Sequence, residues 1–148
     1  MIPTKKIEDF LFAVDASFPV PLSEKHNLGE FAEKLCDKAT MCSAIEDGNI
    51  VALLAGYTDN VENNLGYISI VATLPQAQGK GYGTSLIREF LGIARRKGLH
   101  AVHLYAVREN IPAMRIYKKL GFEDYILDDE PRPNDAHLIY YIDKEVLE

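Results

Sequence analysis

The sequence is poor in cysteine and has no cluster of metal-binding residues. Its two cysteines, Cys36 and Cys42, do not form a CxxC pair. The spacing typical of a zinc site is therefore absent, and no disulfide framework is indicated, which favours a reducing compartment. The histidines are scattered along the chain and show no HExxH arrangement. We therefore expect no metal in this protein.

Long apolar runs and a basic surface are also lacking. No stretch approaches the ~20 apolar residues that span a bilayer, and Glu8 and Asp9 come too early for a signal peptide. A formal net charge of −6 disfavours a nucleic-acid partner, because phosphate binding relies on clustered Lys and Arg. The basic run 95–97 falls at the end of an expected helix, where positive charges interact favourably with the helix dipole. A structural role therefore explains it. We expect a cytoplasmic protein that binds neither membranes nor nucleic acid.

The residues that are present are those of one globular domain. The chain has 148 residues, of which 47% are hydrophobic and 26% charged, enough to bury a single core. It contains no internal repeat, linker or low-complexity tract. We therefore expect residues 1–148 to form a single domain.

The periodicity of apolar residues predicts the secondary structure. An apolar residue every three to four positions predicts helices, and β-rich runs between turn signals predict strands. Asp47-Gly48 is a typical hairpin turn, and Pro112 suits the first turn of a helix. In chain order we expect a helix capped by Thr4 and interrupted at Pro19 and Pro21, a helix at about 23–38, strands at 41–46, 50–58 and 65–73, a helix ending at Lys97, a strand at 101–107, a helix from Pro112 to Leu120, and strands at 122–127 and 137–142.

This order of elements predicts a mixed α/β domain. The strands at 65–73 and 101–107 are joined by a long helix, and a crossover of this kind makes neighbouring strands parallel. The buried stripe of that helix is expected at Leu86, Ile87, Phe90, Leu91 and Ala94.

The segment that connects strand 65–73 to the long helix has the character of an anion site. It reads Gln78-Gly79-Lys80-Gly81-Tyr82-Gly83-Thr84. Backbone N–H groups at such a helix start point into one small space, at the positive end of the helix dipole, and favour a pyrophosphate. The glycines permit positive φ and close approach of a ligand. The Walker pattern GxxxxGK[ST] is absent, and the dinucleotide pattern GxGxxG fails at its third glycine.

Two motifs resemble the GCN5-related N-acetyltransferase (GNAT) superfamily. Gln78, Gly81 and Gly83 match Gln/Arg-x-x-Gly-x-Gly/Ala, and residues 110–122 match Asn-x(6)-Tyr-x(3)-Gly-Phe. The order of elements along nearly the whole chain agrees as well. The resemblance implies a GNAT-like acyl-CoA N-acyltransferase fold: a central, twisted, mostly antiparallel sheet with helices on both faces, in which the parallel strands 65–73 and 101–107 splay apart.

The resemblance also implies acetyl-CoA as the cosubstrate. The pantetheine arm would bond to the backbone in the gap between the splayed strands, as an added strand does, and N–H groups there would stabilise the oxyanion. The pyrophosphate would bind at the glycine-rich loop, and Asn110 would orient CoA or simply start its helix. The cofactor-binding residues implied in this way are Val71, Ala72, Thr73, Gln78, Gly79, Lys80, Gly81, Tyr82, Gly83, Thr84 and Asn110.

Tyr117 matches the family tyrosine that supplies a proton or hydrogen bond to the departing CoA thiolate. An aromatic residue at this spacing would otherwise pack with Met114 and Leu120 on an amphipathic helix. The flanking Asn110 and the pair 121–122 favour the role of an acid, so Tyr117 is the expected catalytic residue.

The sequence does not indicate a general base. Some histone-type members of the family carry a carboxylate at the position that corresponds to Tyr67 here, and some protein N-terminal acetyltransferases carry one at the position that corresponds to Tyr105. These two tyrosines would line the acceptor pocket, hold a water that carries the proton away, or simply be strand aromatics. His103 shares a face with Tyr105, and a structural role is the favoured interpretation.

We therefore expect an N-acetyltransferase that passes the acetyl group from acetyl-CoA directly to a primary amine of a small molecule. A peptide or protein amine is the alternative acceptor, and a non-catalytic acyl-CoA-binding regulatory module is the alternative class. The acidic run 128–130 would attract a cationic amine or be a solvated loop. Pairing at a sheet edge would give a homodimer, although no residue pattern indicates one.

Overall fold

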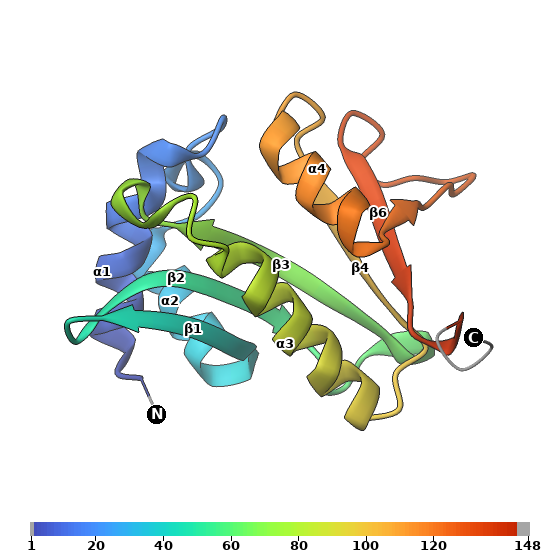
Figure 1. Ribbon diagram of the computed structural model, residues 1–148, viewed down its shortest axis with the longest axis horizontal. Helices are drawn as coiled ribbons and strands as arrows, with labels where there is room; N and C mark the ends of the chain where they lie inside the picture. Colours follow the sequence, from blue (N-terminus) through green and yellow to red (C-terminus); the bar gives the residue numbers. More distant parts are fainter. Residues whose placement is uncertain (1, 145–148) are drawn as a thin grey trace.

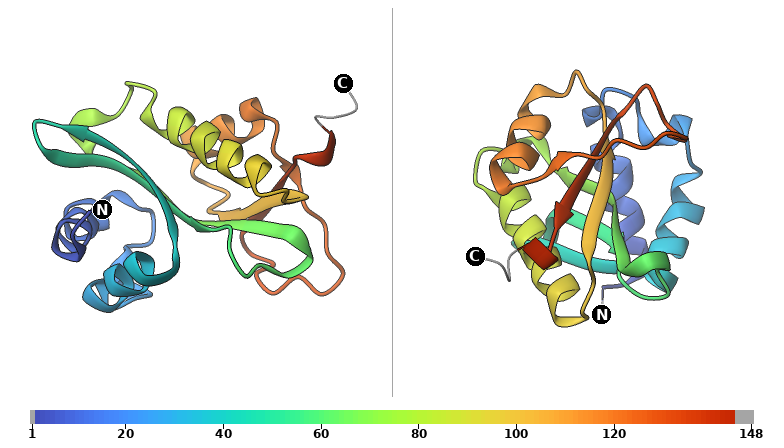
Figure 2. Two further views of the ribbon diagram at one scale, coloured as in Figure 1. Left: turned by 90° about the horizontal axis from the view of Figure 1, so that it is seen from below. Right: turned by 90° about the vertical axis from the view of Figure 1, so that its right-hand side faces the viewer.

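The computed structural model describes residues 2–144, in which helices lie on both faces of one sheet (Figure 1). Helices α1 (Thr4–Val14) and α2 (Leu28–Lys38) cover one face, and α3 (Tyr82–Arg96) and α4 (Ile111–Leu120) lie on the other, as the left view of Figure 2 shows. The strands are β1 (Thr40–Glu46), β2 (Asn49–Tyr57), β3 (Leu65–Thr73), β4 (Ala101–Ala106), β5 (Glu123–Asp124) and β6 (Ala136–Tyr141). Short 3₁₀ helices occupy Asp15–Ser17, Leu22–Glu24, Glu62–Asn64 and Pro75–Ala77.

The strands of the described residues pair in the order β1-β2-β3-β4-β6-β5. Only the β3–β4 pair is parallel among these neighbours, and the other pairs are antiparallel. The predicted mixed α/β fold with a mostly antiparallel sheet and one parallel pair is confirmed. The predicted hairpin turn is confirmed too, since Asp47 and Gly48 adopt φ values of +51° and +80° between β1 and β2.

Three predicted boundaries were wrong. The second helix begins at Leu28, because Asn27 caps it by accepting a hydrogen bond from the N–H of Glu30 at 3.0 Å. Ser23 instead donates to Asp15 through its N–H and its hydroxyl, at 2.8 and 2.6 Å. Thr4 lies inside α1, whose start has no side-chain cap. The strand expected at 122–127 is a strand only over Glu123–Asp124, after which the N–H of Tyr125 donates one further hydrogen bond to the carbonyl of His137.

Two apolar clusters fill the space between the sheet and its helices. The predicted stripe of α3 is buried against β2, β4 and β6 on one face. On the other face the apolar sides of α1 and α2 pack against Leu53, Ala55, Ile70 and Ala72. None of the helices within 2–144 combines the length and the apolar character that crossing a bilayer requires.

A bulge in β3 sets the geometry of the sheet's centre. Ala55 pairs with Ile70 and the next residue, Gly56, pairs with Ile68, so Ser69 is an extra residue in β3. Because one inserted residue reverses the face to which later side chains point, Ile68 packs towards α3 whereas Ile70 packs towards α1 and α2. The pairing between β3 and β4 ends with Ile68 opposite Leu104. From Ser69 onwards the two parallel strands therefore splay apart, as predicted.

We predict that Gly56→Ala destabilises the fold by about 3 kcal/mol, because the position opposite the bulge has no room for a methyl group. A Cβ on Gly56 would lie 2.4 Å from the carbonyl oxygen of Tyr67 and 2.7 Å from the ring of Phe90. Thermal unfolding should show a Tm lowered by roughly 6–12 °C. Gly92→Ala in α3 is the control, since its Cβ would approach nothing closer than 3.5 Å. Equal Tm values for the two variants would contradict this account of the bulge.

Candidate active site

No side chain caps the first N–H groups of α3, which follow the glycine-rich loop. Gly79 and Gly81 both have φ of +82°, a left-handed conformation that favours glycine. Gly81 is the N-cap residue of α3 and makes no side-chain capping hydrogen bond. The N–H groups at this helix start are therefore available to an anion, with the helix dipole behind them.

Gly83 is a glycine that the fold itself does not require. It lies in the first turn of α3, and a Cβ built on it meets no atom within 4 Å. Its φ is not in the left-handed region, unlike that of Gly79 and Gly81. The space that a side chain would fill at position 83 is therefore open, as a site for a bulky phosphate requires.

This open space belongs to a cavity of about 560 Å³, which we call the loop cavity. It extends from the glycine-rich loop along the splayed end of β3 to the start of α4. The residues of the predicted cofactor site that line it are Val71, Ala72, Thr73, Gln78, Gly79, Gly81, Tyr82, Gly83, Thr84 and Asn110. The structure thus brings together all of the predicted cofactor-binding residues except Lys80.

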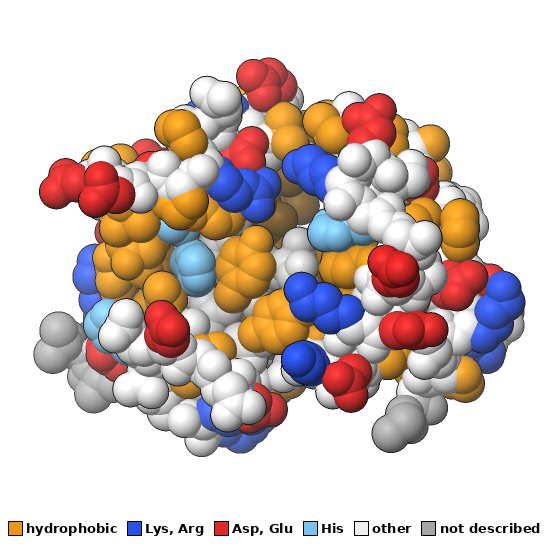
Figure 3. All heavy atoms as spheres, turned by 180° about the vertical axis from the view of Figure 1, so that it is seen from behind, with side chains coloured by type: hydrophobic (Ala, Val, Ile, Leu, Met, Phe, Trp, Pro, Cys, Tyr) orange, Lys and Arg blue, Asp and Glu red, His pale blue; other side chains and the backbone are white. Residues whose placement is uncertain are grey.

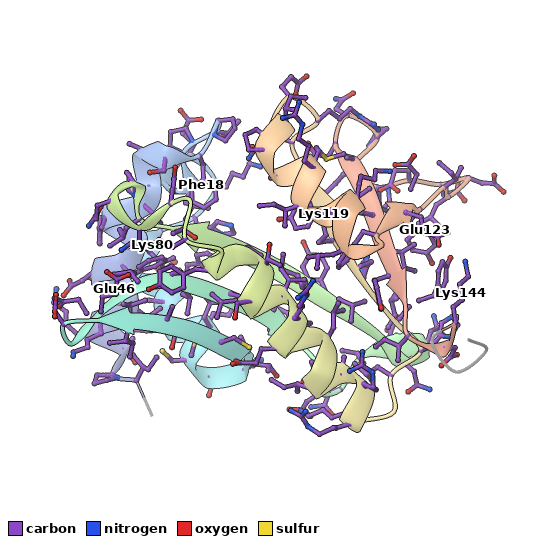
Figure 4. All side chains as sticks on the ribbon, viewed as in Figure 1. Phe18, Glu46, Lys80, Lys119, Glu123 and Lys144 are labelled. Atoms are coloured by element: carbon purple, nitrogen blue, oxygen red, sulfur yellow. The ribbon has the colours of Figure 1, made fainter. Side chains whose placement is uncertain are left out.

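Lys80 points to a carboxylate outside the loop cavity. Its Nζ lies 3.1 Å from Oε2 of Glu46 at the end of β1, and Figure 4 shows the two side chains close together. The hydroxyl of Tyr82 donates a hydrogen bond to the same carboxylate. The hydrogen bond from Tyr82 and the positive charge of Lys80 lower the pKa of Glu46. Glu46 therefore ties this end of the loop to the β1–β2 hairpin.

A second cavity of about 380 Å³ lies on the other side of the splay, and we call it the aromatic cavity. Its wall includes the segment between α1 and α2, the strands β2, β3 and β4, and α4. Its aromatic lining consists of Phe18, His26, Phe31, Tyr57, Tyr67, Tyr105 and Tyr117. The loop cavity and the aromatic cavity share Val71, Asn110, Ala113 and Tyr117, so they meet where β3 and β4 separate.

Tyr117 is the titratable group at this meeting point. Burial raises the pKa of its hydroxyl to about 12, so the hydroxyl keeps its proton at neutral pH. Its ring packs edge-on against Phe122, with 5.8 Å between the ring centroids. The ring of Tyr117 thus packs against the core, and its side chain also lines both cavities. Asn110 likewise caps α4, accepting from the N–H of Ala113 at 3.4 Å, and lines both cavities.

Tyr67 and Tyr105 both line the aromatic cavity, with 6.4 Å between their ring centroids. Burial raises the pKa of Tyr67. Burial and the hydrogen bond to Glu130 raise the pKa of Tyr105 to about 12. Both hydroxyls are therefore protonated at neutral pH, which leaves them as hydrogen-bonding groups of the wall rather than bases.

A chain of polar side chains behind Tyr105 was missed by the sequence analysis. His103 Nδ1 lies 2.7 Å from Nε2 of His137, and Nδ1 of His137 lies 2.6 Å from Glu130. Glu130 also accepts hydrogen bonds from the hydroxyl of Tyr105 at 2.7 Å and from the N–H of Arg132. Burial alone would raise the pKa of Glu130, but these hydrogen bonds outweigh it and lower the pKa to about 2. Glu130 is thus a structural anion, not a solvated member of the run 128–130.

We predict that these hydrogen-bonded side chains make the folded protein less stable at acidic pH. Burial, and secondly the proximity of His137, lower the pKa of His103 to about 4. In the unfolded protein the pKa of His103 is near 6.5. Between about pH 6.5 and 4, His103 is therefore protonated in the unfolded protein but not in the folded one. Stability accordingly rises with pH in this window and falls on acidification. Below this window the lowered pKa of Glu130 adds a further loss as the pH falls from about 4.5 towards 2.

Urea unfolding of the wild type and of His103→Gln at pH 7 and at pH about 4.5 checks this prediction. The side chain of Gln keeps a hydrogen-bonding group beside His137 but does not titrate. The free energy of unfolding should fall less on acidification in the variant than in the wild type. The same loss in both proteins would show that His103 does not carry the dependence.

The sequence of this chain matches a protein family and several known proteins. A sequence model of the acetyltransferase (GNAT) family matches residues 8–122. The mycothiol acetyltransferase of Thermomonospora curvata is 36% identical over 97 residues, which cover 66% of this chain and 32% of that protein. That of an Arthrobacter species is 39% identical over 64 residues, covering 43% and 20% respectively. The chain thus spans a third or less of the length of these relatives.

Solved structures share the fold at low sequence identity. A GNAT-family acetyltransferase of Staphylococcus aureus Mu50 superposes with a TM-score of 0.75 at 13% identity, over 94% of this chain and 92% of that one. The PaiA N-acetyltransferase of Thermoplasma acidophilum, solved with coenzyme A, gives 0.74 at 17% identity, over 95% of each chain. An aminoglycoside 6'-acetyltransferase type Ii gives 0.75 at 13% identity, over 94% and 89%. These similarities establish the overall fold.

Proposed function

The chain belongs to the acetyltransferase (GNAT) family, and we propose that it transfers an acetyl group from acetyl-CoA directly to a primary amine of a small molecule. The observation that carries the proposal is the meeting of two cavities at Tyr117. One cavity has the features of a phosphate site, and the other is lined by aromatic side chains. Two substrates that enter from opposite sides can therefore react at one point without a covalent enzyme intermediate.

Acetyl-CoA fits the loop cavity by its chemistry. Its pyrophosphate suits the free N–H groups at the start of α3, and the space at Gly83 accommodates it. The edge of β3 beyond Ser69 has no partner strand in β4, so its backbone can pair with the pantetheine amides. Val71, which lines both cavities, is where the thioester would lie.

The reaction follows from this arrangement. A neutral amine in the aromatic cavity attacks the thioester carbonyl carbon with its lone pair, and backbone N–H groups of β3 stabilise the oxyanion that forms. The carbon–sulfur bond then breaks, and the CoA thiolate takes the hydroxyl proton of Tyr117. The nitrogen loses a proton to water as the amide forms, and Tyr117 regains its own from solvent. The products are CoA and the N-acetylated amine.

A small-molecule acceptor is supported by the size of the aromatic cavity. Its volume of about 380 Å³ falls within the range of pockets for small ligands. Relatives and structural neighbours named for acetylation of small molecules, mycothiol and aminoglycosides, support the same class.

Thermal melting with acetyl-CoA, and with NADH and ATP as controls, tests the cosubstrate. At about 100 times its Kd, acetyl-CoA should stabilise the fold by about 2.7 kcal/mol and raise the Tm by roughly 5–10 °C. A shift with NADH or ATP in its place would assign the glycine-rich loop to another ligand and overturn the proposal.

A further inference from the structure

The lining of the aromatic cavity contains basic side chains and no acidic ones. Its lining includes Lys25, His26, Lys34 and Arg132 but no Asp or Glu. The protein as a whole has a formal net charge of −6, so this concentration of basic groups runs against the average of the chain. Figure 3 shows this face of the molecule hollowed, with Lys or Arg side chains on both sides of the hollow.

Neither lysine of this wall has an anionic partner within residues 2–144. Arg132 pairs with Asp135 at 2.6 Å, and its guanidinium lies 4.4 Å from the centroid of the Tyr105 ring. Among the residues that the structure describes, no such ion pair involves Lys25 or Lys34. Burial, and then the charges of Lys34 and Lys25, lower the pKa of His26. This wall therefore has two positive charges available to a ligand.

The interior next to these lysines is suited to an apolar body. His26 stacks on Phe31 with 4.2 Å between the ring centroids, and Phe18 and Tyr57 line the same space. An acceptor that reaches from the lysines to Tyr117 thus passes along aromatic side chains. The acids of the loop 128–130 lie outside the lining of this cavity, and the carboxylate of Glu130 is held by hydrogen bonds to His137 and Tyr105.

We propose that the acceptor is an amine with an apolar body and, at the end away from the reacting nitrogen, an anionic group, carboxylate or phosphate, which Lys25 and Lys34 bind. This inference rests on the proposed function and narrows its substrate class. The unpaired lysines attract an anion and repel a second cation, so the site selects against polyamines and other polycations. The reacting amine enters the cavity in its neutral form and is not opposed by these charges.

Four amines of one shape test the proposal, with CoA release as the readout. They are 4-(aminomethyl)benzoate, 4-(aminomethyl)phenyl phosphate, the neutral 4-methylbenzylamine and the dication 4-(aminomethyl)benzylamine. We expect kcat/KM to be highest for the carboxylate or the phosphate, at least tenfold above the dication, with the difference reduced at high salt. The better of the two anionic amines identifies the group that the lysines bind.

Reversing the charge of Lys25 and Lys34 tests whether these two lysines cause the preference for anionic amines. The double variant Lys25→Glu, Lys34→Glu should lower kcat/KM for the anionic amine on the order of tenfold, mainly through KM. The kcat/KM for the neutral amine should change much less. Lys38→Glu, on the same helix as Lys34 but outside the lining, is the control, and it should behave as the wild type does. All three lysines are exposed, so the variants should keep the Tm of the wild type.

The possible results distinguish the proposed acetyltransferase activity from the proposed anionic class of the acceptor. A preference for the neutral or the dicationic amine, or an unchanged preference in the double variant, overturns the inference while the acetyltransferase activity stands. No CoA release with any of the four amines, although acetyl-CoA binds, overturns both.

Discussion

Tyr117→Phe is expected to lower kcat by about 10²–10⁴-fold while the affinity for acetyl-CoA and the Tm stay close to those of the wild type. The substitution removes only the hydroxyl, and Phe preserves the ring that packs against Phe122. Because burial raises the pKa of this hydroxyl to about 12, the wild-type group is a proton donor at neutral pH. The CoA thiolate would have to leave without that proton in the variant.

Steady-state kinetics with Tyr141→Phe as the control separates this role from general effects of a lost hydroxyl. Tyr141 lies on β6 and lines neither the loop cavity nor the aromatic cavity. It should therefore retain full activity. If Tyr117→Phe keeps a wild-type kcat, Tyr117 is a packing residue and the proposed acid is wrong.

Gly83→Asp is expected to weaken acetyl-CoA binding by at least about 100-fold without destabilising the protein. A carboxylate at position 83 fills the space next to the free N–H groups and repels the pyrophosphate that should bind there. The fold itself tolerates the change, because the Cβ meets no atom within 4 Å. A carboxylate in the first turn of α3 also stabilises the helix by roughly 0.3–1 kcal/mol, because it interacts favourably with the helix dipole.

Isothermal titration with acetyl-CoA and a thermal melt measure the two expectations on the same sample. Gly83→Ala is the matched control, since it adds a methyl group without charge and the family motif accepts alanine at this position. It should bind acetyl-CoA much as the wild type does. Binding of acetyl-CoA to Gly83→Asp with wild-type affinity would show that the phosphates do not lie at the start of α3.

The features predicted correctly from the sequence are those with local causes. The buried stripe of α3 follows from helical spacing, and the β1–β2 turn follows from Asp47-Gly48. The loop cavity likewise combines a helix start with glycines that are neighbours in the sequence. The parallel pair that splays was expected through the resemblance to the GNAT superfamily, and the extra residue Ser69 gives it a physical cause.

The features that were missed depend on residues far apart in the chain. Glu46 binds Lys80 across 34 residues, and this pairing draws Lys80 away from the loop cavity. His103 meets His137 because β4 and β6 pair in one register, which the long loop between α4 and β6 leaves undetermined in the sequence. The early start predicted for α2 has a more local reason: Asn27 caps the helix, and Ser23 binds Asp15, which is only eight residues away.

One incubation tests the central claim most directly: the protein with acetyl-CoA and 4-(aminomethyl)benzoate, followed by mass spectrometry of the small molecules and of the intact protein. The account predicts equal amounts of free CoA and N-acetylated amine, enzyme that carries no acetyl group, and loss of both products in Tyr117→Phe. Acetyl-CoA that binds but is not consumed with this amine or the other three would contradict the account and identify the protein as an acyl-CoA-binding module. An acetyl group found on the protein as an intermediate would contradict direct transfer between the two cavities.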